Sequence, residues 1–170
     1  TFLFILGALQ GGIGWWMVKS GLAADPSVSQ YRLVIHLGMA FLILGILIWT
    51  ILDLVGERGG HASKLRIYHA QFSLILISIT IIAGGLVAGL HAGLIYNTFP
   101  LMGGQIFPPD YAQLQPLWRN IFENETAVQF NHRFLATLSV VTIVLLLWST
   151  MRGSVNKHCS LAVHVLSGLV

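Results

Sequence analysis

The chain has 170 residues, of which 55% are hydrophobic and only 9% are charged, and its formal net charge is +3. Because soluble domains carry about 25% charged residues, this composition excludes an ordinary soluble protein and predicts a membrane protein. The few basic residues are scattered over connecting segments and form no dense patch. This distribution argues against a nucleic acid partner and leaves membrane lipid as the expected surroundings.

Four apolar runs are long enough to be membrane-spanning helices, since a span needs about 20 mostly apolar residues. The runs are continuous and do not alternate, which favours helices over the strands of a barrel. In chain order we predict spans over 2–18, 33–54, 72–94 and 130–151, and a fifth run that starts at Leu161. The predicted fold class is therefore all-α, a polytopic transmembrane helix bundle.

The connections between the spans predict an orientation. The second and fourth connections, which hold Lys64 and Arg152, are basic, whereas the first and third also carry acids such as Asp110. The positive-inside rule then places 55–71 in a loop on the cytoplasmic or matrix side. The chain starts and stops within apolar segments, which we interpret as a piece of a longer protein.

Two histidines are expected at the same depth in the membrane. His36 and His132 each lie about one turn inside the outer end of a predicted span, and these two spans run in the same direction. A histidine within a membrane helix is rare and usually faces the bundle interior. Because heme iron accepts axial imidazole, we interpret both as metal ligands, with hydrogen-bonded structural histidines as the alternative.

Polar neighbours extend this candidate heme site. Arg32 and Arg133 lie near the membrane boundary, where guanidinium groups can pair with heme propionates, or act only as interfacial anchors. Gln129 precedes His132 by three residues and shares its helix face. The candidate cofactor-binding residues are thus His36, His132, Arg32, Gln129 and Arg133.

The other histidines have weaker signals. His61, His69 and His158 fall in or beside polar loops and are expected to be solvated or interfacial, while His91 and His164 have no visible partner. Glycines recur every four residues at 85, 89 and 93 and at 7 and 11. Such stripes predict close helix packing.

Three motifs point to one family. "LQGGIGWWMVKSGL", "AGLHAGLIYNTFPLMGG" and "FENETAVQFNHR", in this order and spacing, closely resemble the heme A synthase family of alphaproteobacteria and mitochondria. The resemblance spans nearly the whole chain. It implies a multi-pass protein of the bacterial or mitochondrial inner membrane with eight helices in two similar four-helix halves. Residues 1–54 would end the first half, and 72–170 would start the second.

The resemblance also implies an activity. The family oxidises a ring methyl of heme O to a formyl group, which gives heme A for cytochrome oxidase. His36 would ligate heme in the reacting half and His132 would ligate heme b in the other half. The helix that carries the family's glutamate, in an E-x-x-H-R pattern of the reacting half, is absent from this chain, and Gln129 occupies the equivalent place in the second half. The resemblance therefore implies no catalytic residue within the chain. Implied partners are heme O synthase, an electron acceptor and a second copy in a homo-oligomer.

Two other functions use the same features. A non-catalytic diheme b-type cytochrome needs the same histidines, and a transporter could place a substrate between repeated halves beside the broken segment "YNTFPLMGG". Heme content separates the transporter from the other two. Formation of heme A separates the enzyme from the cytochrome.

Overall fold

The structure is a computed structural model that describes residues 2–19, 28–55 and 63–152. Its long helices are α1 (Phe2–Val18), α2 (Gln30–Val55), α3 (Lys64–Gly89) and α5 (Glu125–Met151). Between α3 and α5 lie the short helices η1 (Ala92–Leu94), η2 (Leu117–Arg119) and α4 (Asn120–Glu123). These ranges contain no strand, only one isolated bridge between Met102 and Gln105. The predicted all-α class is confirmed.

Three helices, α2, α3 and α5, are long and apolar enough to cross a membrane. Helix α1 is apolar over 17 residues, which is the lower limit for a span. The predicted fifth run from Leu161, together with His61, His158 and His164, lies outside the described residues.

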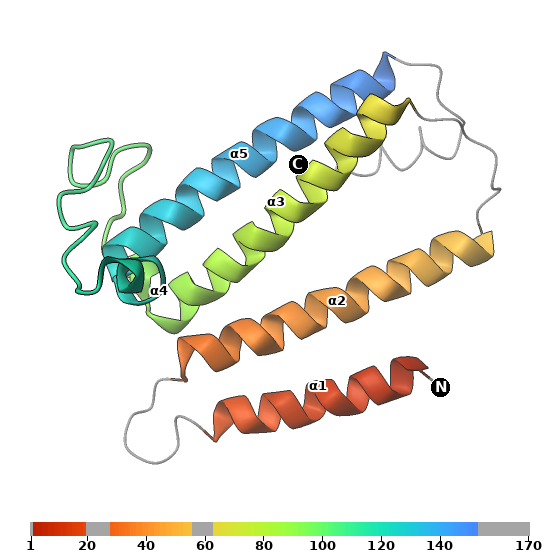
Figure 1. The fold of residues 1–170 in the computed structure, drawn as a ribbon, viewed down its shortest axis with the longest axis horizontal. Helices are drawn as coiled ribbons and strands as arrows, with labels where there is room; N and C mark the ends of the chain where they lie inside the picture. Colours follow the sequence, from red (N-terminus) through yellow and green to blue (C-terminus); the bar gives the residue numbers. More distant parts are fainter. Residues whose placement is uncertain (1, 20–27, 56–62, 153–170) are drawn as a thin grey trace.

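The long helices form a row in which neighbours in sequence are neighbours in space (Figure 1). Helix α2 packs between α1 and α3, and α3 packs between α2 and α5. Along the direction of the helix axes, α2 and α5 begin on the same side of the bundle, whereas α3 begins on the opposite side (Figure 1). His36 and His132, six and seven residues after the starts of α2 and α5, therefore lie towards the same end.

Helices α2, α3 and α5 all start earlier than the apolar runs predict, and the difference is larger for α3 and α5 than for α2. Helix α3 begins at Lys64, inside the segment predicted as a loop, because the Ser63 side chain accepts the first-turn N–H of Arg66. Helix α5 begins at Glu125, because the Asn124 side chain accepts the backbone N–H groups of Thr126 and Ala127. Such caps satisfy donors that have no partner within the helix. His132 consequently lies about two turns after the start of α5.

Glycines bring α2 and α3 into close contact. A Cβ built at Gly85 would lie 2.9 Å from the Val34 side chain, and one at Gly89 would lie 2.5 Å from the Cα of Gln30. The predicted packing role is confirmed for Gly85 and Gly89, whereas Gly93 lies in η1, beyond the end of α3, where a built Cβ would lie 3.7 Å from the Val87 side chain. Gly7 and Gly11 of α1 have no described atom within 4 Å of a built Cβ, so their stripe forms no contact in this part of the chain.

Candidate functional site: two histidines seated on glycines

The imidazole of His36 lies against α1. A Cβ built at Gly14 would approach its Cε1 atom to 2.9 Å, so a larger residue at this position would require the ring to shift. The Gln10 amide donates to the His36 carbonyl over 3.1 Å and lies 3.4 Å from the ring Nε2. Nδ1 of His36 and Oε1 of Gln10 are buried and have no hydrogen-bond partner within the described part of the chain. We call Gln10 and Gly14 the first seat.

The imidazole of His132 lies against α3 in the same manner. A Cβ built at Gly84 would approach its Cε1 to 3.0 Å, and its Nδ1 lies 3.2 Å from the Thr80 carbonyl oxygen. A carbonyl only accepts, so the ring proton is on Nδ1 and the lone pair of the neutral ring is on Nε2. We call Thr80 and Gly84 the second seat.

Side-chain bonds fix the second seat between α3 and α5. The Thr80 hydroxyl donates to the Leu76 carbonyl over 2.8 Å and lies 2.9 Å from the Ser139 hydroxyl of α5. Polar side chains of this kind join helices within a membrane. The register of α3 against α5, and with it the position of His132, is therefore defined by more than apolar packing.

These features fit heme ligation. A metal-bound histidine usually donates its second ring N–H to a carbonyl or carboxylate, which is the arrangement at His132. At His36, by contrast, the buried Nδ1 and the Gln10 Oε1 have no hydrogen-bond partner among the described residues, so this ring does not show that arrangement. In the described ranges no three His, Cys, Asp or Glu side chains gather into a metal-binding group, so each histidine stands as a separate candidate ligand.

Gln129 lies beside His132 in sequence but holds a loop. Its side chain is 3% exposed and donates to the carbonyls of Gly93 and Tyr96 over 3.3 and 2.9 Å. Its Oε1 is buried without a hydrogen-bond partner. The structure thus gives Gln129 the task of fixing the segment that follows η1 over the start of α5.

The two candidate arginines also bind backbone carbonyls. Arg133 donates to the Thr98 carbonyl over 2.5 Å and to the Tyr96 carbonyl. Arg32 donates to the Trp16 carbonyl over 2.9 Å, and its guanidinium carbon lies 4.5 Å from the centre of the Trp16 ring. Both arginines lie one turn or less from a candidate histidine, and their present contacts are those of interfacial anchors.

The remaining described histidines have structural positions. His69 Nε2 donates to the Thr142 carbonyl over 3.0 Å. This bond joins α3 to α5 at a position ten residues after His132 in α5. His91 adopts a left-handed conformation with φ of 54° where the chain leaves α3. Sequence reasoning had assigned His69 to the interface without finding its bond between helices.

An asparagine pair organises the connection before α5. Asn120 accepts the Leu114 N–H and donates to the carbonyls of Leu114 and Leu117. Asn124 caps α5 and donates to the Asp110 carbonyl over 2.8 Å. Sequence reasoning missed both residues, although Asn124 before "ETAV" is a recognisable helix-start signal.

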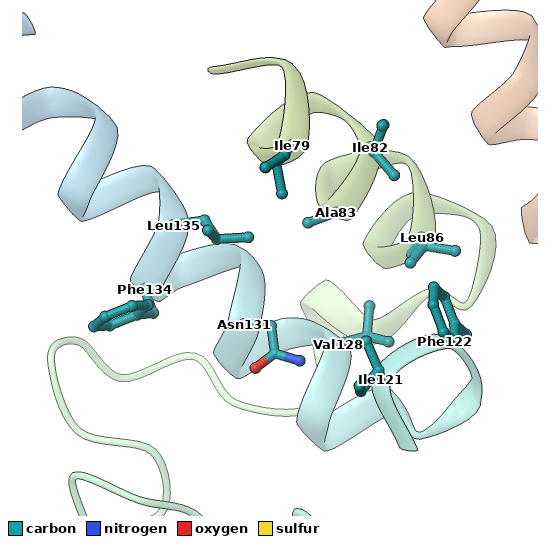
Figure 2. Close-up of a pocket in the computed structure, with 10 residues that line it drawn as sticks. All are labelled: Ile79, Ile82, Ala83, Leu86, Ile121, Phe122, Val128, Asn131, Phe134 and Leu135. Atoms are coloured by element: carbon teal, nitrogen blue, oxygen red, sulfur yellow. The ribbon is translucent and has the colours of Figure 1, made fainter. Parts of the chain in front are cut away.

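A separate apolar cavity of about 290 Å³ lies among α3, α4 and α5 (Figure 2). Asn131 is the polar side chain in its lining, among residues that include Ala83, Val128 and Leu135. The Tyr111 hydroxyl donates to the side-chain oxygen Oδ1 of Asn131 over 2.9 Å. Neither His132 nor its seat lines this cavity, so it is distinct from the candidate heme site.

The helices and seats define a multi-pass membrane protein with two half-buried imidazoles on neighbouring helix pairs. A family model described as "COX15-CtaA: Cytochrome oxidase assembly protein" matches residues 1–170. The chain belongs to this family, and it is a multi-pass protein of the inner membrane.

Curated relatives cover nearly all of the chain. Heme A synthase of Nitrosospira multiformis is 46% identical over 97% of this chain and 49% of its own length. Heme A synthase of Parvibaculum lavamentivorans is 46% identical over 89% of the chain and 44% of its own length, and that of Wolbachia pipientis wMel is 50% identical over 84% and 41%. The chain therefore spans about half the length of these relatives. No solved structure matches it.

Proposed function

We propose that this chain is part of a heme A synthase, an oxidoreductase that converts heme O to heme A for cytochrome oxidase. Relatives of that name at 46–50% identity support the reaction. The observation that carries heme binding is the bond from His132 Nδ1 to the Thr80 carbonyl, which directs the ring lone pair to Nε2. Such a ring is prepared to ligate iron.

The two histidines take different hemes in this proposal. His36 ligates the substrate, heme O, and His132 ligates a heme b cofactor, whose iron supplies redox chemistry when bound. Arg32 and Arg133 lie close to the histidines in sequence. In this proposal each guanidinium binds a heme propionate in place of, or in addition to, its backbone carbonyl, because it carries several N–H donors. Gln129 is neutral, so it cannot replace a carboxylate as acid or base. The chain's own residues therefore bind and orient heme, and none is proposed as catalytic.

Partners follow from the chemistry. Oxidation of a methyl to a formyl group removes electrons and protons and adds one oxygen atom, so it requires an electron acceptor and an oxygen source such as water, and heme O must come from heme O synthase. The exposed apolar faces of α1, α2 and α5 contact lipid, other parts of the full-length protein, or a second copy of it.

Heme extraction tests the reaction. The full-length protein is expressed in cells that make heme O but have no synthase of their own, and extracted hemes are identified by mass spectrometry. Heme A supports the proposal. Heme b without heme A indicates a diheme cytochrome, and absence of heme indicates a transporter. The 170-residue chain alone, reconstituted with heme O and an acceptor, is expected to form no heme A.

Substitution tests the ligand. His132→Ala should remove or alter one low-spin b-type heme signal while the protein still inserts in the membrane. His69→Ala is the matched control, because His69 also bonds to a carbonyl between α3 and α5 but should leave both hemes unchanged. Gln129→Ala should have a milder effect, about 0.5–1.5 kcal/mol. An unchanged heme spectrum in His132→Ala would refute this assignment.

A further inference from the structure

The two seats have the same geometry. Gln10 and Gly14 are four residues apart, as are Thr80 and Gly84, so each pair occupies one helix face. From a Cβ built at Gly14, the Cε1, Nδ1 and Nε2 atoms of His36 lie at 2.9, 3.4 and 3.6 Å. The corresponding distances from Gly84 to His132 are 3.0, 3.4 and 3.7 Å. The seats therefore differ mainly in the group that precedes the glycine.

That group engages a different ring nitrogen in each seat. In the second seat a backbone carbonyl holds Nδ1 of His132, and no side-chain rotation can remove it. In the first seat a side-chain amide lies at Nε2 of His36, while Nδ1 has no partner. A ring nitrogen has one lone pair, so an amide donor and a metal ion compete for the same position.

The Gln10 amide has a second acceptor beside the ring. The same amide nitrogen also donates to the His36 backbone carbonyl over 3.1 Å, a shorter contact than its 3.4 Å to the ring. An iron on the ring nitrogen would displace the amide from the lone pair, and the carbonyl would remain available to it as an acceptor. When iron leaves, the amide is already beside the lone pair.

We propose that Gln10 competes with heme iron for Nε2 of His36, so that the first seat exchanges its heme while the second seat retains one. This proposal rests on the proposed function, in which heme O must enter and heme A must leave in each cycle, whereas heme b stays. Gln10 is a positioning residue here, because it acts through His36.

Heme transfer measures this exchange. Full-length protein loaded with heme O and heme b is mixed with excess apomyoglobin, and the rate at which each heme leaves is followed by extraction and mass spectrometry. Gln10→Leu keeps a side chain of similar size and removes the amide donor. Release of heme O should therefore slow about two- to tenfold, the effect of one neutral hydrogen bond. Release of heme b should not change. Gln113→Leu, in the loop before α4, is the matched control and should alter neither rate.

Gln10→Asn provides a second variant that keeps an amide. Its side chain is shorter by one carbon–carbon bond, about 1.5 Å, so it no longer reaches Nε2 and heme O release should again slow. Unchanged or faster heme O release in both variants overturns the competition. Equal slowing of heme O and heme b also overturns it, since that result indicates a general change of packing. Failure of the proposed function gives a different result, namely heme b retention in His132→Ala or heme O retention in His36→Ala.

Discussion

The α3–α5 pair and the α1–α2 pair carry one candidate histidine each, but they are built differently. Helix α3 buries five residues and α5 buries six, whereas α1 buries only Leu6 and α2 buries none. The α3–α5 pair also has polar bonds at Thr80–Ser139 and His69–Thr142. The comparison teaches that His132 is held by a region organised by its own contacts, while His36 depends on a single glycine and a single glutamine.

The largest loss of stability is expected from a substitution of Asn124, which caps α5 at the start of the α3–α5 pair. Asn124→Ala removes the α5 cap and the bonds to the carbonyl of Asp110 and to Asn120, which should destabilise the protein by about 2–4 kcal/mol. Thermal unfolding in detergent measures the loss. Asn97→Ala, at an exposed position in the same connection, should change stability little; equal losses in both variants would show that Asn124 anchors nothing.

The second seat is tested by adjacent glycines. Gly84→Ala should push the His132 ring and weaken heme b binding about tenfold, as loss of an outer partner does at metal sites. In Gly85→Ala the new Cβ would lie 2.9 Å from the Val34 side chain. This substitution should therefore disturb packing as much as Gly84→Ala does, but between α2 and α3, and leave the heme b spectrum unchanged. Heme titration followed by absorption spectroscopy distinguishes them. Similar spectra for the two variants would mean that Gly84 is only a packing residue.

The first seat should respond more weakly. Gly14→Ala meets Cε1 of His36 at 2.9 Å, but the His36 ring has only one long hydrogen bond and can shift, so we expect heme O binding to weaken by about two- to fivefold. Gly12→Ala has no described atom within 4 Å and serves as the control. A loss larger than that of heme b in Gly84→Ala would reverse the comparison between the two regions.

The smallest effect concerns a surface contact between the two regions. The Tyr31 hydroxyl at the start of α2 donates to the Glu123 carboxylate of α4 over 3.0 Å. The hydrogen bond from Arg119, followed by that from Tyr31, lowers the pKa of Glu123 below its ordinary value of 4.5. Tyr31→Phe should lower the melting temperature by about 2 °C or less, because exposed charged contacts contribute little.

The pH dependence of this contact has a defined sign. A carboxyl group whose pKa is lowered by folding stabilises the folded protein above its ordinary pKa, and this contribution is lost as the pH falls through the lowered pKa. The difference in melting temperature between wild type and Tyr31→Phe should therefore be present at neutral pH and be lost as the pH falls below the ordinary pKa of 4.5 and through the lowered one. A difference that grows with acidification would contradict the assignment.

The sequence predicted the helices better than their starts or contacts. Continuous apolar runs identify α2, α3 and α5 because a span must hide its backbone from lipid. The same criterion placed the start of α5 at Phe130, since it ignores the polar first turns that Asn124 caps. The candidate heme site could be predicted only in part from the sequence. Depth could relate His36 to His132, but the seats come from α1 and α3, and a glycine facing an imidazole leaves no signal in a single sequence.

The row arrangement also has a consequence for biosynthesis. Every extensive contact between the long helices joins consecutive ones, α1 with α2, α2 with α3, and α3 with α5. Each helix can therefore dock on its predecessor as soon as it leaves the ribosome and enters the bilayer, without waiting for a distant part of the chain. Local contacts of this kind favour rapid assembly. The seat for each imidazole is in the membrane before its histidine arrives, because α1 is made before α2 and α3 before α5.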